Sequence, residues 1–288
     1  MSYSDQKSSE AYMGNPPPYY RHNDEVPQYH TPRFNDAATD SRTLIPATSK
    51  FPPTFNCYYT WKLKQVYYLG PSSEDPQYAI AYDYKLFSKK ESLHLHNGPT
   101  NKAPILATVS RKALGWHDKA TITLHGDNGE ERTIAFEKPE DASWTSWSKS
   151  QVRAFRFRVH KDGEEEEFQW RTSNGNEIKE LAGHSSGWKL VRVGLPEPSA
   201  GGARKERDLG VTSDGQEVVA VLAHNMSFSM SKGYKFAFMG TGLTGTLGAE
   251  WETTAVLSGF WLWWLSLSNS TTSASSASAA SAAAAAAT

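Results

Sequence analysis

Hydrophobic and polar residues alternate with a period of two over most of the chain between Thr54 and Met239. Successive side chains of a strand point to opposite faces, so this period predicts half-buried β-strands. The first run, Thr54–Leu69, reads as one long strand with Phe55, Cys57 and Tyr59 on its apolar face. The pattern recurs in Tyr78–Phe87, Ser92–His96, Pro104–Val109, Ala120–Gly126, Glu131–Lys138, Arg153–Val159, Glu167–Arg171, Trp188–Val193, Gln216–Ala223 and Tyr234–Met239.

Turn signals separate these runs, among them Asn97-Gly98, Asp162-Gly163, Asn174-Gly175 and Asp214-Gly215. Such dipeptides are typical of β-hairpins, and we find no amphipathic helix between the strands. Eleven or twelve short strands with hairpin connections predict a mainly β protein, built as an antiparallel sandwich or barrel.

The alternation ends before Ala255–Leu267, which contains thirteen uncharged residues. A helix formed by this stretch would be apolar on nearly every side. A helix of that length spans about 20 Å, which is short of the ~30 Å hydrocarbon core of a bilayer. We therefore favour a helix buried on every side over a membrane anchor, which is the alternative. A closed sheet of about twelve strands can enclose one helix, here at about 250–267. Its core residues would be Leu257, Phe260, Trp261, Trp263 and Trp264.

The two ends of the chain differ in composition from its middle. Residues 1–51 are rich in Pro and Tyr with few aliphatic residues, and residues 268–288 are almost entirely Ser, Thr and Ala. Neither buries enough apolar surface to offset the entropy of ordering, so we predict two disordered arms around one domain, residues 52–267.

The net charge of −1 gives no basic field that would point to nucleic acid. The single cysteine, Cys57, excludes an intrachain disulfide and favours a reducing compartment. The first ten residues are polar, and we expect no secretory signal. We expect a cytoplasmic monomer that can also lie peripherally at the plasma membrane.

Several short motifs resemble the tubby C-terminal-like domains, which include tubby, the phospholipid scramblases and the LURP-one-related proteins. The closest likeness is to fungal members whose function is not established. The motifs are Tyr58–Leu63 (YYTWKL), Leu93–Pro99 (LHLHNGP), Pro104–Val109 (PILATV), Phe168–Ile178 (FQWRTSNGNEI), Gly187–Val193 (GWKLVRV) and the closing hydrophobic helix, within Pro52 to Leu267.

The resemblance implies a twelve-stranded barrel threaded by the C-terminal helix, and it implies no catalysis. Tubby-like members bind phosphoinositide headgroups through basic residues, and scramblases are linked to lipid movement. This chain departs from them in lacking the cysteine clusters of some scramblases and a dense Asp run. The tubby phosphoinositide ligands have no residue-by-residue match here.

Three motifs suggest catalysis or cofactors, and none of them is complete. Gly240-x-Gly242-x-x-Gly245 is followed by neither a parallel strand nor an acidic residue, so we interpret it as a glycine-rich turn. The G-x-S-x-G match at Gly183–Gly187 runs into a strand instead of the helix that a nucleophile elbow needs. His94 and His96 share one predicted strand face without a third metal ligand. We predict no enzyme, no cofactor and no metal.

Arginine alternates with phenylalanine in Ala154–Val159, which places Arg156 and Arg158 together outside the barrel. With Arg153 and Lys161 they are our candidate ligands for an anionic phospholipid headgroup, because guanidinium groups pair well with phosphate. The alternative, which we favour on sequence grounds, is cross-strand pairing of the arginines with Glu164–Glu167.

The N-terminal arm contains two overlapping P-P-x-Y matches, the type of motif that WW domains bind. Prolines set a polyproline II conformation in advance, so docking costs little entropy. The arm would bind a WW-domain protein such as a HECT-type ubiquitin ligase, as adaptor or substrate, with the barrel as a passive scaffold. The residues concerned are Pro16, Pro17, Pro18, Tyr19 and Tyr20.

Overall fold

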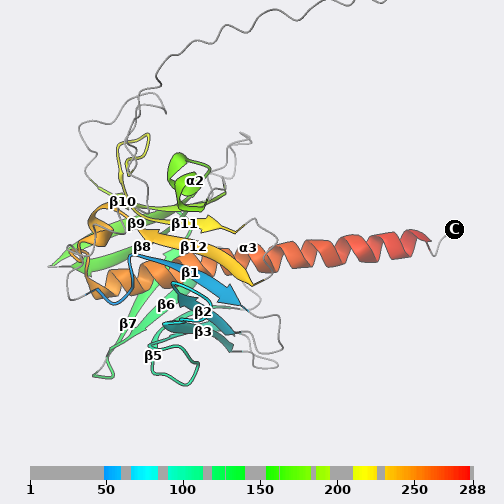
Figure 1. The fold of residues 1–288 in the computed structure, drawn as a ribbon, viewed down its shortest axis with the longest axis horizontal. Coiled ribbons are helices and arrows are strands. Elements are labelled where there is room, and N and C mark those ends of the chain that lie inside the picture. The colour runs from blue at the N-terminus through cyan, green and yellow to red at the C-terminus, as the bar shows by residue number, and fades with distance from the viewer. Residues whose placement is uncertain are drawn as a thin grey trace, which may run out of the picture. The chain divides into compact units, whose positions relative to one another are not determined.

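Twelve antiparallel strands form a closed barrel around the C-terminal helix in the computed structural model of the chain (Figure 1). The structure describes residues 49–59, 66–83, 90–112, 119–126, 128–139, 154–161, 163–182, 186–194, 210–225 and 231–285, with side chains up to Ser268. The strands are β1 Thr54–Tyr59, β2 Val66–Gly70, β3 Tyr78–Asp83, β4 Lys90–His96, β5 Ile105–Lys112, β6 Lys119–His125, β7 Glu131–Glu137, β8 Ala154–Lys161, β9 Glu164–Ser173, β10 Gly187–Val193, β11 Glu217–His224 and β12 Lys232–Phe238. The predicted barrel and its enclosed helix are therefore confirmed.

Each strand pairs with its neighbours in sequence, and β12 pairs with β1 to close the barrel. The alternation that predicted the strands is visible in their burial. In β6, for example, Ala120, Ile122 and Leu124 are buried while Thr121 and Thr123 are only partly so. The apolar side chains point inward and contact the helix.

The prediction of one long strand over Thr54–Leu69 is wrong, because this stretch contains both β1 and β2. The two strands pair antiparallel, with Cys57 opposite Leu69 and Tyr59 opposite Tyr67, so the chain reverses between them. Residues 60–65, TWKLKQ, contain no Gly, Pro, Asn or Asp that would signal a turn. The odd-numbered positions before and after the reversal are also apolar, with Gln65 as the exception, so the pattern does not reveal the reversal.

A short helix between β9 and β10, α2 (Asn176–Ala182), was missed by the sequence prediction, which placed a hairpin turn at Asn174-Gly175. Ile178 and Leu181 lie one helical turn apart and are buried against the outer face of β11 and β12. This second apolar cluster explains why Val218–Ala223 are buried on both faces of β11.

The glycine-rich turn after β12 is confirmed. It contains the 3-10 helix η2 (Gly240–Leu243), and Gly240, Gly245 and Gly248 adopt φ angles of 49°, 69° and 83°. These left-handed conformations favour glycine and turn the chain back into the barrel. The dinucleotide interpretation fails because the strands are antiparallel.

The central helix α3 spans Gly248–Ala285 and passes through the barrel. The predicted core residues are all buried: Leu257 and Phe260 are 0% exposed, Trp261 1%, Trp263 6% and Trp264 7%. The helix continues beyond the predicted end at 267, through a stretch of Ser, Thr and Ala, to Ala285. Among the residues described, no helix is both long and apolar enough to cross a membrane.

Residues 1–48 lie outside the described residues, and so do the side chains after Ser268. The P-P-x-Y residues Pro16–Tyr20, the candidate lipid ligand Arg153 and most of the G-x-S-x-G match therefore have no structural description.

Candidate functional site

The barrel has two unlike ends, which we call the start end and the exit end. At the start end β12 finishes at Phe238 and α3 begins at Gly248, and at the exit end α3 leaves past Leu267 (Figure 1). Because the strands are antiparallel, β1, β3, β5 and β7 finish at the exit end and β4 and β6 begin there.

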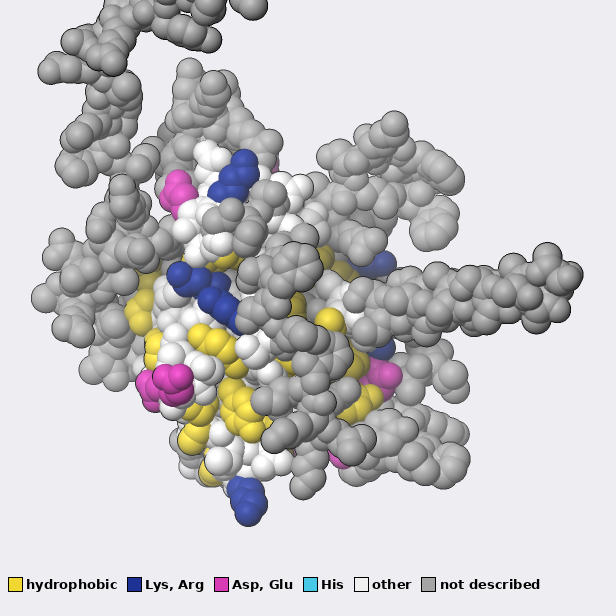
Figure 2. All heavy atoms as spheres, turned by 45° about the vertical axis from the view of Figure 1, so that its right-hand side comes forward, with side chains coloured by type: hydrophobic (Ala, Val, Ile, Leu, Met, Phe, Trp, Pro, Cys, Tyr) yellow, Lys and Arg dark blue, Asp and Glu magenta, His cyan; other side chains and the backbone are white. Residues whose placement is uncertain are grey.

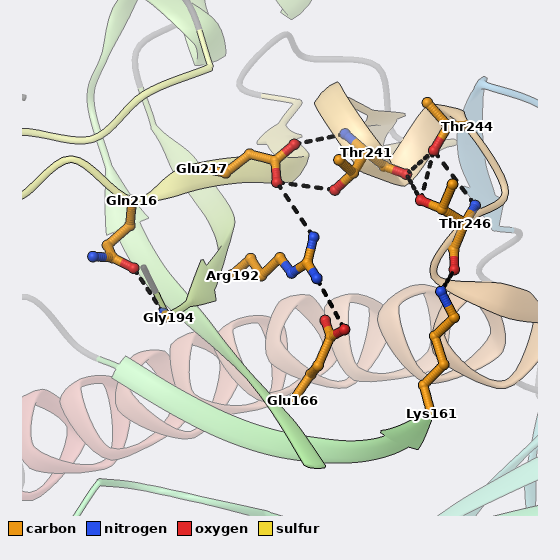
Figure 3. Close-up of polar contacts among 9 residues, drawn as sticks. All are labelled: Lys161, Glu166, Arg192, Gly194, Gln216, Glu217, Thr241, Thr244 and Thr246. Atoms are coloured by element: carbon orange, nitrogen blue, oxygen red, sulfur yellow. Dashed lines mark hydrogen bonds and ion pairs between the residues drawn. The ribbon is translucent and has the colours of Figure 1, made fainter. Parts of the chain in front are cut away.

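A polar network at the start end holds the turn that leads into α3 (Figure 3). The Glu217 carboxylate accepts hydrogen bonds from the Thr241 backbone N–H at 2.6 Å and from the Thr241 hydroxyl at 2.9 Å. Arg192 pairs with Glu166 at 2.9 Å and lies 4.0 Å from Glu217. Charge-assisted hydrogen bonds of this kind fix η2 to the barrel wall.

The predicted lipid ligand Lys161 belongs to the same network. Its ammonium group donates a hydrogen bond to the backbone carbonyl of Thr246, just before α3 (Figure 3). Lys161 therefore has a structural partner at the start end of the barrel.

A buried carboxylate ties the first described residues to the helix. Glu252 of α3 is 2% exposed and accepts a hydrogen bond from the Lys50 backbone N–H at 2.9 Å. Burial raises the pKa of Glu252, and contacts with Lys50, Ser49 and Phe51 oppose that shift. The Tyr78 hydroxyl donates to the Lys50 carbonyl, so the segment is held from both sides.

The predicted arginine pair on β8 lies outside the barrel, as expected, and it faces carboxylates. Arg158 contacts Glu167 at 2.7 Å and Glu165 at 3.6 Å. Arg156 lies 3.5 Å from Glu137 and 3.9 Å from Glu167. Hydrogen bonding to Glu167 raises the pKa of Arg158. The geometry therefore matches the cross-strand pairing that we favoured over a headgroup site.

The arginine pair also borders a cleft between β7 and β8. These strands pair only through Glu137 and Arg156, whereas β8 and β9 pair along their whole length. The cleft has a volume of about 280 Å³, and Ile134, Phe157 and Val159 line it together with the charged residues. Among the described strands of the barrel, β7 and β8 are the neighbours with the fewest paired residues.

Aromatic rings of α3 gather toward the exit end and contact a cation there. The rings of Trp261 and Trp264 stack with centroids 5.1 Å apart, and the Arg111 guanidinium lies 5.5 and 5.8 Å from their centroids. Glu91 accepts a hydrogen bond from Arg111 at 2.6 Å and holds it in place. A cation over an indole face is electrostatically favourable.

Tyrosines from the surrounding strands extend this aromatic group. Tyr82 of β3 stacks on Trp264 at 5.5 Å, and Tyr59 and Tyr67 lie 5.8 and 5.6 Å from Trp263. Burial raises the pKa of Tyr67 to about 12. Tyr59 and Tyr82 are partly exposed, which brings aromatic surface to the exit end.

Lysines surround the aromatic group on the β4–β7 side of the exit end. Lys90 and Lys112 are opposite each other on β4 and β5, and both are exposed. The Lys119 side chain is 79% exposed and pairs with Glu137 at 3.0 Å, and Lys138 follows β7. We call these four lysines the exit rim. Figure 2 brings the right-hand side of Figure 1 forward and shows basic, acidic and hydrophobic side chains interspersed on this face.

A chain of polar side chains crosses five strands on the outer face and was not found from the sequence. The Thr108 hydroxyl lies 3.0 Å from His94 Nδ1 and 3.0 Å from His125 Nε2. Asp83 and Glu131 flank the two imidazoles at 3.7 and 3.2 Å. Burial lowers the pKa of His94, against the raising effect of Asp83.

His94 and His96 differ in exposure. His94 is partly exposed, whereas His96 is buried with its Nδ1 2.8 Å from the Ala103 carbonyl. In the part of the chain that the structure describes, no group of three or more His, Cys, Asp or Glu side chains could hold a metal ion.

Comparison with protein-family models finds none that matches this chain, and comparisons with curated proteins and with solved structures find no match either. The resemblance to tubby C-terminal-like domains therefore stays a prediction.

Proposed function

We propose that this chain is a non-enzymatic recruitment module whose exit end docks on an anionic membrane surface. The observation that carries the proposal is the meeting of three features at one end: the lysines of the exit rim, the partly exposed Tyr59 and Tyr82, and the point where α3 leaves the barrel. Tryptophan and tyrosine are the residues enriched at membrane–water interfaces.

Electrostatics supports docking through this end. Each lysine near an anionic leaflet contributes about 1 kcal/mol of attraction within a Debye length of the surface. The lysine stems also cover apolar surface while their ammonium groups reach the headgroups. Arg156, Arg158 and Lys161 contact partners in the protein and lie away from Tyr59 and Tyr82. We base the proposal on the exit rim because its lysines are exposed at the same end of the barrel as these two tyrosines.

The proposed role is binding rather than chemistry because α3 occupies the barrel interior. An eight-stranded barrel can hold a small ligand in its lumen, whereas here Trp251, Phe260 and Trp261 fill that space. The surface is then the part of the domain available to partners. The expected setting is the cytoplasmic side of a membrane, which the anionic lipids favour.

Charge reversal at the exit rim should weaken membrane binding. We expect Lys112→Glu to reduce the affinity for phosphatidylcholine vesicles containing phosphatidylserine by roughly thirtyfold, because two units of charge are lost where each is worth about 1 kcal/mol. Vesicle flotation at low and physiological ionic strength measures this. Added salt should weaken wild-type binding as well.

Lys102→Glu is the matched control. Lys102 is equally exposed and lies just before β5, at its start end, whereas Lys112 ends the same strand. The two variants have the same net charge, so a nonspecific charge effect would weaken both equally. Equal binding of the two variants, with unchanged melting temperatures, would refute docking through the exit rim.

As the alternative function, we propose that the arm with Pro16–Tyr20 recruits a WW-domain protein, with the barrel as scaffold. The sequence alone favours this proposal. Each P-P-x-Y match needs its tyrosine, so the double substitution Tyr19→Ala and Tyr20→Ala should abolish capture by a purified WW domain. Tyr29→Ala is the control within the same arm, and capture that survives the double substitution would exclude the motif.

A further inference from the structure

A β-bulge interrupts β12 close to the exit end. Across the pairing with β1, Cys57 lies opposite Tyr234 and the next residue, Tyr58, lies opposite Lys232, so Gly233 is the extra residue. A side chain at this position would collide with the helix, because a Cβ on Gly233 would lie 2.4 Å from the Trp263 ring. The bulge therefore fits the chain around a tryptophan of α3.

The bulge places two lysines on the same side of the strand. Residues three apart in a regular strand point to opposite faces, but one extra residue restores a common direction. Lys232 and Lys235 accordingly line one cavity of about 350 Å³. Bulges often re-aim side chains beside functional sites.

The cavity lies between the strands and α2. Glu180, Leu181 and Ala182 form its wall on the helix, and Ala223 and Asn225 complete the strand side together with the two lysines. The Asn225 side chain donates a hydrogen bond to the Lys232 carbonyl at 2.8 Å, which fixes the backbone at the bulge. Both lysines are half-buried where they line the cavity.

The charges in this cavity are unbalanced. No ion pair of Lys232 or Lys235 is found among the described residues, in contrast to Arg156 and Arg158. Burial and the nearby charge of Lys232 lower the pKa of Lys235. Glu180, on the opposite wall, has its pKa raised by burial and by Glu177. An anion between the lysines would relieve their mutual repulsion.

We propose that this cavity binds a phosphate group through the ammonium groups of Lys232 and Lys235. Phosphate oxygens accept several charge-assisted hydrogen bonds, and lysine is a common phosphate ligand in proteins. The phosphate can belong to a soluble molecule or to a lipid headgroup. The site is separate from the exit rim, which lies over β4–β7, so its test does not depend on membrane docking by that rim.

Two measurements distinguish a soluble phosphate compound from a lipid headgroup as the ligand. They are calorimetric titration with inorganic pyrophosphate and flotation with phosphatidylcholine vesicles containing phosphatidic acid. Lys232→Gln and Lys235→Gln should each weaken binding about tenfold, whereas Lys102→Gln should not. Glu180→Gln should strengthen binding, because it removes a negative charge that faces the anion. Unfolding would lower the affinity for phosphate, so a gain in affinity in Glu180→Gln cannot result from a loss of structure.

Each outcome decides the proposal. Pyrophosphate binding that depends on the two lysines supports a site for soluble phosphate compounds. Binding to phosphatidic acid vesicles alone, with the same dependence, supports a headgroup site. If neither probe binds, or if binding is the same in Lys232→Gln, Lys235→Gln and wild type, the cavity is not a phosphate site.

Discussion

Phe260→Ala is expected to lower the free energy of unfolding by about 3–5 kcal/mol, the range for phenylalanine truncation in a packed core. Phe260 is fully buried in the part of α3 inside the barrel. Its ring contacts Tyr67 at 4.9 Å, Trp263 at 5.5 Å and Tyr234 at 6.4 Å between centroids. The substitution leaves a cavity between helix and wall that rigid strands cannot close. Chemical denaturation followed by circular dichroism measures the change.

Ser266→Ala on the same helix is the control. Ser266 is exposed, and its hydroxyl donates a hydrogen bond to the Leu262 carbonyl one turn earlier, so the change should stay within about 0.5 kcal/mol. If Phe260→Ala also cost less than about 1 kcal/mol, the helix would not be part of the core.

Gly233→Ala is expected to destabilise the barrel by about 1–3 kcal/mol, although it adds a single methyl group. The new Cβ would lie 2.4 and 2.9 Å from atoms of the Trp263 ring, and that ring is confined by Tyr59, Tyr67 and Tyr234. The clash can be relieved only by moving the strand or the helix. Thermal denaturation in parallel with wild type measures the loss.

A double-mutant cycle identifies the cause of that loss. In a Trp263→Leu background the smaller side chain leaves room for the methyl group, so Gly233→Ala should cost at least about 1 kcal/mol less than it does in the wild type. Gly129→Ala is a useful comparison, because no atom lies within 4 Å of its Cβ position and only its φ of 78° opposes the change. Additive costs in the cycle would mean that Trp263 does not pack on Gly233.

The sequence predicts the barrel and the helix because both depend on local periodicity. A period of two locates most strands, and an uncharged stretch that is apolar on every side locates the buried part of α3. The reversal between β1 and β2 escapes prediction because its segment has no turn residue and keeps its apolar residues at odd-numbered positions. Helix α2 escapes because seven residues are too few for a helical period to stand out.

The candidate sites are harder to predict because they depend on register. The alternation alone places Arg156 and Arg158 outside, but one partner of Arg156, Glu137, comes from β7, across a long connection. The polar chain through Thr108 needs the alignment of five strands, which no single run contains. Lys232 and Lys235 share a face only because of the bulge at Gly233, and the tryptophan that requires glycine there lies thirty residues later.

The central claim is that the tryptophan-containing part of α3 is enclosed by the sheet, and amide hydrogen exchange tests it most directly. Peptides that cover Thr254–Leu265 should exchange only through global unfolding, as slowly as strand β11, which is buried on both faces, and anionic vesicles should not accelerate their exchange. Exchange of these amides that is clearly faster than that of β11, with or without vesicles, would show that the helix lies outside the barrel and would contradict the account.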